Sequence, residues 1–224
     1  MSTRALRTTP GGTRGRTSQK LLLTALHLYA EEGLAAVSLR RISAEAGSRN
    51  SAAMHYHFSN KLGVIQALVE MIAEQLDSIA RGIREEEGPD KDLRGAFRNT
   101  LRPLAELPQT QPWGADAIRF MSRVMSENSP DLAEVINPIY QPFWQRIDKR
   151  LANLLPDIPE DVRRLRLMFM SVNVFHGMAE VAALSHTPLG DLSHIDNSTL
   201  LDHLVDYLIG GLKSPTPLQG ATKQ

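Results

Sequence analysis

The sequence predicts an all-α protein of about nine helices. Apolar residues recur three and four positions apart along most of the chain, which is typical of amphipathic helices. Serine, asparagine or proline followed by acidic residues stands before several of these segments, and glycine follows two of them, as expected at helix starts and stops. No stretch combines apolar–polar alternation with a hairpin dipeptide, so nothing indicates a β-sheet.

Composition excludes several classes of protein. The 224 residues, of which 42% are hydrophobic, suffice for a folded core, and the absence of cysteine excludes disulfide frameworks and thiolate sites. Residues 1–16 lack the apolar stretch of a signal peptide. The most apolar run, 165–184, is interrupted by polar residues, which favours a core or interface helix over a membrane span. We therefore expect a cytoplasmic protein without membrane contact.

Charge is distributed unevenly along the chain. Residues 1–61 contain nine basic and three acidic residues, a net charge of +6, and because the whole chain is neutral the remainder carries −6. A basic first quarter on an acidic body is typical of a protein with a nucleic-acid-binding head. A basic tail that only aids solubility would give the same asymmetry.

The first part of the chain predicts four helices. Thr17 or Ser18 caps the first, and Gly33 suits its left-handed stop. Ser38 caps the second and Gly47 ends it, while Asn60 caps the fourth. The predicted ranges are 17–32, 39–46, about 51–57 and 61–83. Acidic residues, a glycine and a proline make 85–92 the clearest linker.

Five further helices are predicted in the rest of the chain, at about 92–107, 114–127, 130–155, 159–185 and 198–212. Pro103 argues against an unbroken first helix of this set, and Pro138 and Pro142 predict a kink or a split in the third. The polar tail from Pro215 is expected to be loose.

Two short helices around Gly47 have the spacing of a helix-turn-helix. The second must enter the major groove, so its exposed face should be small, polar or basic. That description fits Arg49, Asn50, Ser51, Ala52, Ala53 and His55. The residues expected to hold the two helices at a fixed angle are Leu39, Ile42, Ala46 and either Met54 or Tyr56. An ordinary tight helix pair is the alternative.

The same segment resembles the DNA-binding signature of the tetracycline-repressor (TetR) family. The resemblance rests on Gly33, on SLRRISAEAG at 38–47 and on YHFSNK at 56–61, and it covers about residues 17–65. Residues 48–55 form a stretch one residue longer than is usual, which leaves the register of the recognition helix open by one residue.

The resemblance implies roles for individual residues. Thr17 and Ser38, at helix starts, would offer hydroxyl and N–H groups to phosphates. Tyr56, His57 and Lys61 would contact the DNA backbone, and Phe58 would belong to the core. The residues implied to face base edges are Arg49, Asn50, Ser51 and Ala52, where arginine could read guanine and asparagine adenine.

The last two predicted helices are unusually apolar, which predicts a homodimer. A helix that is apolar on all sides needs partners on all sides, and a two-fold interface can supply them. The resemblance implies the same arrangement, a four-helix bundle of two helices from each subunit. The expected interface residues are Phe175, Met178, Leu201, Leu204, Val205 and Leu208.

Aromatic residues and methionines in the preceding helices suit an apolar effector cavity, although plain packing would use them equally well. The expected ligand contacts are Phe120, Tyr140, Phe143, Trp144, Asn173 and His176, with Arg119 as a further polar anchor. Nothing in the sequence identifies the effector.

No cofactor or metal site is expected. His55 and His57, two positions apart on a helix, point to different faces, and His176 with Glu180 supplies too few ligands. No catalytic triad, carboxylate pair or phosphate loop is present in the sequence, so we expect no enzyme.

The sequence thus predicts four segments: a flexible basic arm at 1–16, a three-helix DNA-binding domain at 17–62, a ligand-binding and dimerisation domain at 63–214 and a tail at 215–224. The expected function is a repressor that binds double-stranded palindromic DNA as a dimer and is released by a small apolar or amphipathic effector. An activator, a regulator without a small inducer, and a helical enzyme or carrier with a vestigial DNA-binding head remain alternatives.

Overall fold

The structure, a computed structural model, describes residues 13–48, 56–87, 92–127 and 129–215. Across these residues it is all-α, as predicted, with no β-strand. None of the helices in these segments is long and apolar enough to cross a membrane.

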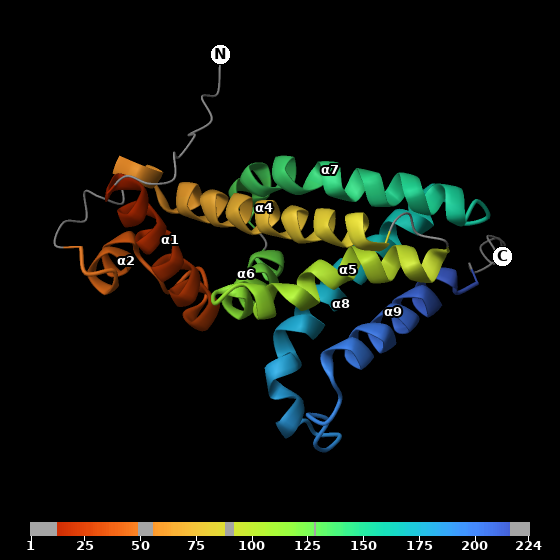
Figure 1. Cartoon of the computed structure of the whole chain (residues 1–224). Coiled ribbons are helices and arrows are strands. Elements are labelled where there is room, and N and C mark those ends of the chain that lie inside the picture. The colour runs from red at the N-terminus through yellow and green to blue at the C-terminus, as the bar shows by residue number, and fades with distance from the viewer. Residues whose placement is uncertain (1–12, 49–55, 88–91, 128, 216–224) are drawn as a thin grey trace, which may run out of the picture.

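The N-terminal head contains α1 (Thr13–Glu32), α2 (Leu39–Glu45) and the first turns of α4 (Lys61–Glu87). Figure 1 shows it at one end of the molecule. Its core is formed by fully buried side chains from all three helices, among them Leu26, Tyr29, Ile42 and Val64. Because α4 starts in this core and continues into the body, the head and body share one helix.

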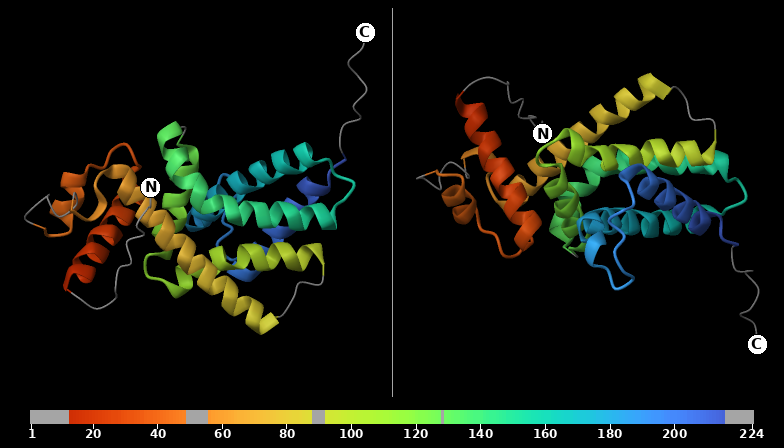
Figure 2. Two further views of the ribbon diagram at one scale, coloured as in Figure 1. Left: turned by 90° about the horizontal axis from the view of Figure 1, so that it is seen from above. Right: turned by 60° about the horizontal axis from the view of Figure 1, so that its bottom comes forward.

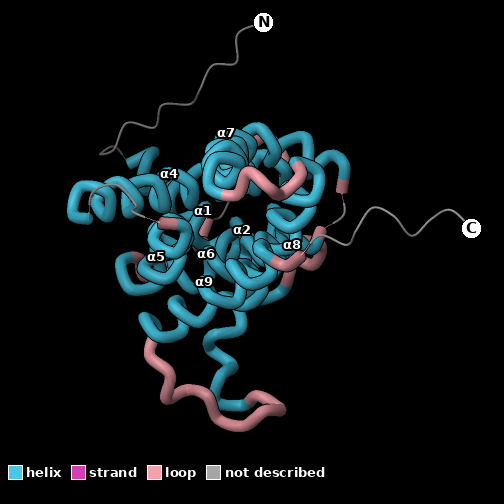
Figure 3. Tube along the Cα trace, turned by 90° about the vertical axis from the view of Figure 1, so that its right-hand side faces the viewer, coloured by secondary structure: helices cyan, strands magenta, loops and turns pink. Residues whose placement is uncertain are grey.

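The body is built from the far part of α4 and the remaining helices. They are α5 (Leu93–Thr110), α6 (Gly114–Ser126), α7 (Pro130–Leu154), α8 (Glu160–Ala179), the 3₁₀ helix η1 (Glu180–His186) and α9 (Asn197–Lys213). The helices α5 and α7 contact α4, α8 lies against α6 and α7, and α9 packs on α5 (Figure 2). The loop between η1 and α9 projects away from the body (Figure 3).

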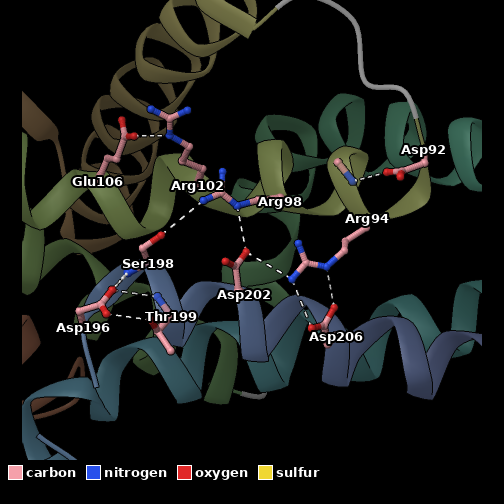
Figure 4. Close-up of polar contacts among 11 residues, drawn as sticks. Asp92, Arg94, Arg98, Arg102, Glu106, Asp196, Ser198, Thr199, Asp202 and Asp206 are labelled. Carbon is pink, nitrogen blue, oxygen red and sulfur yellow. Dashed lines mark hydrogen bonds and ion pairs between the residues drawn. The ribbon is translucent and has the colours of Figure 1, made fainter. Parts of the chain in front are cut away.

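A ladder of ion pairs fixes α9 on α5 (Figure 4). Arg94 Nε donates to Asp206 at 2.8 Å, and Arg98 Nε donates to Asp202 at 3.0 Å. Basic residues four apart on one helix meet acidic residues four apart on the other, so the register of α9 is set by charge and by apolar packing together.

Several helix boundaries differ from the prediction. The helix α1 starts at Thr13, four residues early, because a helix nucleated in the buried segment extends at one hydrogen bond per residue. Thr17 is therefore inside the helix and does not cap it. The predicted third helix lies mostly outside the described residues, and its end, 56–58, is helical. Residues 85–87, assigned to the linker, complete α4.

Prolines interrupt neither of the helices in which they were expected to do so. The helix α5 is continuous through Pro103, and α7 through Pro138 and Pro142. Of the kink or split predicted for α7, the split is therefore wrong. An interior proline costs about 3 kcal/mol. In α5 the buried leucines at 101, 104 and 107 offset this cost by packing into the core.

Candidate nucleic-acid interface and effector site

The helix-turn-helix is held by local hydrogen bonds. Ser38 Oγ accepts from Arg41 N at 3.2 Å and caps α2. Gly47 takes the left-handed conformation with φ of 71°, and the next amide, Ser48 N, donates to Ser43 O at 2.9 Å. Ile42 and Ala46 are buried. Their contact with the second helix of the pair stays a prediction, because most of that helix lies outside the described residues. The predicted left-handed stop at Gly33 is confirmed by its φ of 88°.

The structure does not describe the residues expected to read bases. Arg49, Asn50, Ser51, Ala52 and His55 all lie outside the described residues, so their contacts stay predictions.

The end of the third helix is described, and it presents Tyr56 to solvent. Its side chain is 72% exposed, so the alternative in which Tyr56 holds the helix pair together is wrong. His57 is half-buried and lies edge-on to the Tyr56 ring, and Phe58 packs against the core. Because the Tyr56 hydroxyl group is exposed at the end of a helix, it can contact a DNA phosphate.

Exposed basic side chains also lie on the other two helices at the N-terminal end of the head. Arg16 and Lys20 of α1 and Arg40 of α2 are exposed. Arg41 instead forms a two-pronged ion pair with Glu32, with Nη2 donating to Oε1 at 2.7 Å. Lys61 Nζ lies 5.9 Å from the centre of the Tyr29 ring, a cation–π contact within the head. Arg41 and Lys61 therefore help to hold the head together.

The residues expected to bind an effector are mostly engaged in packing. Phe120 is fully buried against Tyr29, and Phe143 and Trp144 contact each other edge-on. Tyr140 donates its hydroxyl to Met121 Sδ at 2.9 Å, and burial raises the pKa of Tyr140. Asn173 is exposed and donates to Phe169 O at 2.8 Å.

His176 bridges two helices. Its Nδ1 lies 2.7 Å from Ser122 Oγ and its Nε2 lies 3.3 Å from Ser126 Oγ, so both ring nitrogens are engaged by α6. Both ring nitrogens of His176 therefore have hydrogen-bond partners.

A cavity of about 190 Å³ lies elsewhere, between α5, α6, α8 and α9. Arg119, expected as a polar anchor, is one of its lining residues, whereas Phe120, Tyr140, Phe143, Trp144, Asn173 and His176 are not.

The expected dimer residues divide into two groups. Leu201, Val205 and Leu208 are buried in the core of their own protomer, because the stripe that they form faces α5 and α8, and they are not available to a partner. Phe175, Met178 and Leu204 are half-buried. The exposed apolar side chains on these two helices are Leu165, Met168, Phe169, Val172 and Tyr207.

A polar junction between head and body was not predicted. His27 Nδ1 lies 2.9 Å from Asp116 Oδ2, and Arg119 forms an ion pair with Glu31. Arg123 donates to the carbonyls of Ala30 and Glu31, at 2.7 and 2.9 Å, at the C-terminal end of α1. A cation there also complements the negative end of the helix dipole. We name these α1 and α6 residues the α1–α6 clasp.

The clasp brings three metal-ligating residue types together, since ligand atoms of His27, Glu31 and Asp116 lie within 4.8 Å of one another. The Arg119 guanidinium already pairs with both carboxylates. An ion-pair network therefore accounts for the cluster. The α1 and α6 residues are almost 90 positions apart in the chain, so no local sequence spacing could have predicted the cluster.

Two family matches cover most of the chain. Residues 21–68 match the bacterial regulatory proteins of the tetR family, and residues 98–211 match the tetracyclin repressor-like C-terminal domain.

Solved structures share the fold at low sequence identity. The fatty acid degradation regulator FadR from Bacillus halodurans is 15% identical, with a TM-score of 0.62 over 92% of this chain and 99% of that one. NalD of Pseudomonas aeruginosa, the secondary repressor of the MexAB-OprM multidrug efflux pump, is 19% identical, with a TM-score of 0.58 over 88% and 96%. A tetR-family regulatory protein from Rhodococcus RHA1 is 14% identical, with a TM-score of 0.57 over 88% and 97%. With the two family matches, the capped helix-turn-helix and the helical body, the chain belongs to the tetracycline-repressor family of DNA-binding transcriptional regulators.

Proposed function

We propose that the protein represses transcription by covering a palindromic operator as a homodimer, and that a small apolar or amphipathic effector releases it. The observation that carries this proposal is the double connection between head and body. The helix α4 runs from the head into the body, and the α1–α6 clasp holds the end of α1 on the body. A shift of α6 or α4 would therefore move the reading head.

In this proposal the segments 17–62 and 63–214 divide these tasks, and Val64 in the first turn of α4 still belongs to the core of the head. The first segment binds DNA, and the second binds the effector and the partner protomer. NalD is described as a secondary repressor and FadR as a regulator of fatty acid degradation, which supports the regulatory role. A protein that binds chromosomal DNA should act in the cytoplasm.

Within the head, base contacts belong to the recognition segment and backbone contacts to its surroundings. We assign base edges to Arg49, Asn50, Ser51, Ala52 and His55. Phosphate contacts go to the exposed Tyr56 and to His57, with Ser38 and Lys61 at the adjoining helix starts. Thr17 lies one turn inside α1, so its backbone N–H group is not at the helix start. We therefore assign it a phosphate contact through its side chain only.

Fluorescence anisotropy with the chain's own upstream DNA tests the assignment. Tyr56→Phe removes an exposed hydroxyl without disturbing packing and should weaken binding to all sequences alike. Arg49→Ala should also change base preference, at roughly 1–3 kcal/mol for a read position. Binding should weaken steeply as salt rises.

The matched control is Arg146→Ala, which removes an exposed arginine of α7, in the body. It should leave binding unchanged. Salt-independent binding, or no binding to any genomic fragment, would contradict the DNA-binding role.

The dimer face is the exposed apolar surface of α8 and α9. Leu165, Met168, Phe169 and Val172 follow the three- and four-residue spacing of one helix face, and Tyr207 lies on the neighbouring helix. Gly210 and Gly211 leave open space beside them, which allows close approach. A second copy of this chain is the occupant that we propose, because a two-fold axis pairs this self-complementary face with itself.

Phe169 is the residue through which this interface can be tested. The side chain is 53% exposed. Half of a phenylalanine's surface is roughly 100 Å², worth about 2.5 kcal/mol on burial, and a two-fold axis counts it twice. Phe169→Ala should therefore weaken the dimer by about 5 kcal/mol, which raises its dissociation constant by about three to four orders of magnitude.

Light scattering after gel filtration measures the result. Leu189→Ala is the control, because Leu189 is 87% exposed in the loop after η1 and away from the face. A wild-type monomer at micromolar concentration would contradict both the interface and the palindromic operator. An unchanged dimer in Phe169→Ala would contradict only the choice of face.

A reporter assay separates the regulatory alternatives. Deletion of the gene should raise transcription from the bound promoter, whereas a fall would indicate an activator. A regulator without a small inducer would keep its DNA affinity with every effector tried. An enzyme or carrier with a vestigial head would not bind its upstream DNA.

A further inference from the structure

The cavity between α5, α6, α8 and α9 has an apolar wall with two polar side chains. Its volume is about 190 Å³, and Arg119 and Asn197 are the polar residues among those that line it. Ala105, Ile118, Met178 and Leu201 represent the rest. A cavity of about 150 Å³ holds one benzene ring, so this one has room for a single ring or a short alkyl chain.

Arg119 belongs to the cavity and to the α1–α6 clasp at the same time. Its Nη1 donates to the Glu31 carboxylate of α1 and lies 3.5 Å from Asp116 Oδ1. A guanidinium has five N–H donors in one plane, which match a carboxylate in a two-pronged arrangement. A carboxylate in the cavity would meet an arginine that is already shared with the head.

We propose that this cavity binds a small monocarboxylate carrying one ring or a short alkyl chain, with Arg119 as its anchor, and that the bound carboxylate displaces Glu31 from Arg119. The apolar part of the ligand occupies the wall formed by Ile118, Met178 and Leu201. Loss of the Arg119–Glu31 ion pair loosens α1 from α6. The effect on DNA rests on the proposed function.

The coupling has a definite size and sign. A partly exposed ion pair contributes up to about a fivefold factor in an equilibrium constant. Coupling between sites is reciprocal. Glu31→Gln removes the competitor of the ligand, so it should tighten carboxylate binding by about two- to fivefold while it weakens operator binding.

Isothermal titration of the full chain with benzoate and hexanoate, compared with benzamide and hexanamide, tests the site. The acids should bind at least about tenfold more tightly than the amides, as expected for a charge-assisted pair. Arg119→Gln should abolish this preference, and Arg119→Lys should retain part of it because the charge stays while the planar fork is lost. Ala105→Trp, which fills the cavity, should abolish binding of all four probes, and Arg146→Gln should leave it unchanged.

Thermal unfolding of each variant reports whether it is folded. The lysine and glutamine variants of Arg119 test the role of this side chain independently. Equal binding of acids and amides, an acid preference that survives Arg119→Gln, or no binding of any probe would overturn the proposal. Unchanged carboxylate affinity in Glu31→Gln would overturn the displacement of Glu31.

Operator anisotropy without probes keeps the two proposals apart. Wild-type protein that binds DNA but no carboxylate refutes the site and leaves the repressor function standing. Wild-type protein that binds benzoate but no DNA refutes the repressor function and leaves the carboxylate site standing. Benzoate that binds and leaves operator affinity unchanged refutes the coupling through Arg119.

Discussion

Gly63 lies in the first turn of α4, where the chain from the third helix passes over it. A Cβ at this position would lie 2.0 Å from Phe58 O and 3.1 Å from Phe58 C. The amide of Gly63 is also fixed, since it donates to Asn60 Oδ1 at 2.8 Å. An alanine would therefore force the backbone at residue 58 away from α4 by about 1 Å.

The cost can be estimated against a matched site on the same helix. Overpacking typically costs 1–3 kcal/mol, and a backbone oxygen cannot swing aside as a side chain can. Alanine regains about 1 kcal/mol through helix propensity. Gly63→Ala should thus lower the free energy of unfolding by about 2 kcal/mol. Gly82→Ala, whose Cβ would have nothing within 4 Å, should raise it by about 0.5–1 kcal/mol.

Urea denaturation followed by circular dichroism measures both variants, and operator anisotropy measures their function. Only Gly63→Ala should weaken DNA binding, because residues 56–58, which end the third helix, rest on this turn. Equal stabilisation by the two alanines, with full DNA binding, would refute the reasoning that this close approach requires glycine.

Three further changes test the packing of head and body. Tyr29→Phe should raise the free energy of unfolding by about 1 kcal/mol, because the buried Tyr29 hydroxyl has no hydrogen-bond partner. Burial also raises the pKa of Tyr29 to about 12, so the wild type should lose stability as pH rises from about 10 to 12. Thermal unfolding at several pH values should show no such loss from this residue in the variant. Asp148→Asn should cost about 3 kcal/mol by urea denaturation, because it leaves the buried Arg163 without its carboxylate partner at 2.7 Å. Although burial raises the pKa of Asp148, hydrogen bonds from Arg163 and Arg164 outweigh it and hold that pKa below 3.8. The stability that Asp148 contributes should therefore persist above about pH 4 and disappear as pH falls further. If wild type and variant lost stability identically in acid, this reasoning would be contradicted. Ser38→Ala should cost about 1 kcal/mol through loss of the α2 cap, and unchanged stability would show that the cap is dispensable.

Local signals predicted the head well because its determinants lie within a few residues of one another. Ser38 and Gly47 bracket α2 through hydrogen bonds that span three to five residues. The cap at Ser38 and the left-handed stop at Gly47 follow from residue types with strong local preferences, so the sequence indicated both. The start of α1 was missed because Thr17 and Ser18 resemble caps, whereas helix extension depends on the buried segment that follows.

Burial partners were predicted less well than burial itself. The stripe containing Leu201, Val205 and Leu208 was correctly read as apolar and helical, yet helical periodicity does not state which surface covers it. The pairing of Arg94 and Arg98 with Asp202 and Asp206 orients α9 so that this stripe faces its own protomer. The exposed face then falls on Leu165, Met168, Phe169 and Val172, which are within the run that was recognised as apolar on all sides.

The charge asymmetry of the chain acquires a second meaning at the α1–α6 clasp. Two of the three acidic residues in the first 61 positions, Glu31 and Glu32, end α1, and both pair with arginines. Glu32 pairs with Arg41 inside the head, whereas Glu31 reaches Arg119 in the body. Glu31 thus places an acidic side chain where the head joins the body, while Arg16, Lys20 and Arg40 are exposed on the head. Because Glu31 attaches the head through Arg119, which also lines the cavity, neutralising Glu31 would weaken this attachment without removing a positive charge from the head.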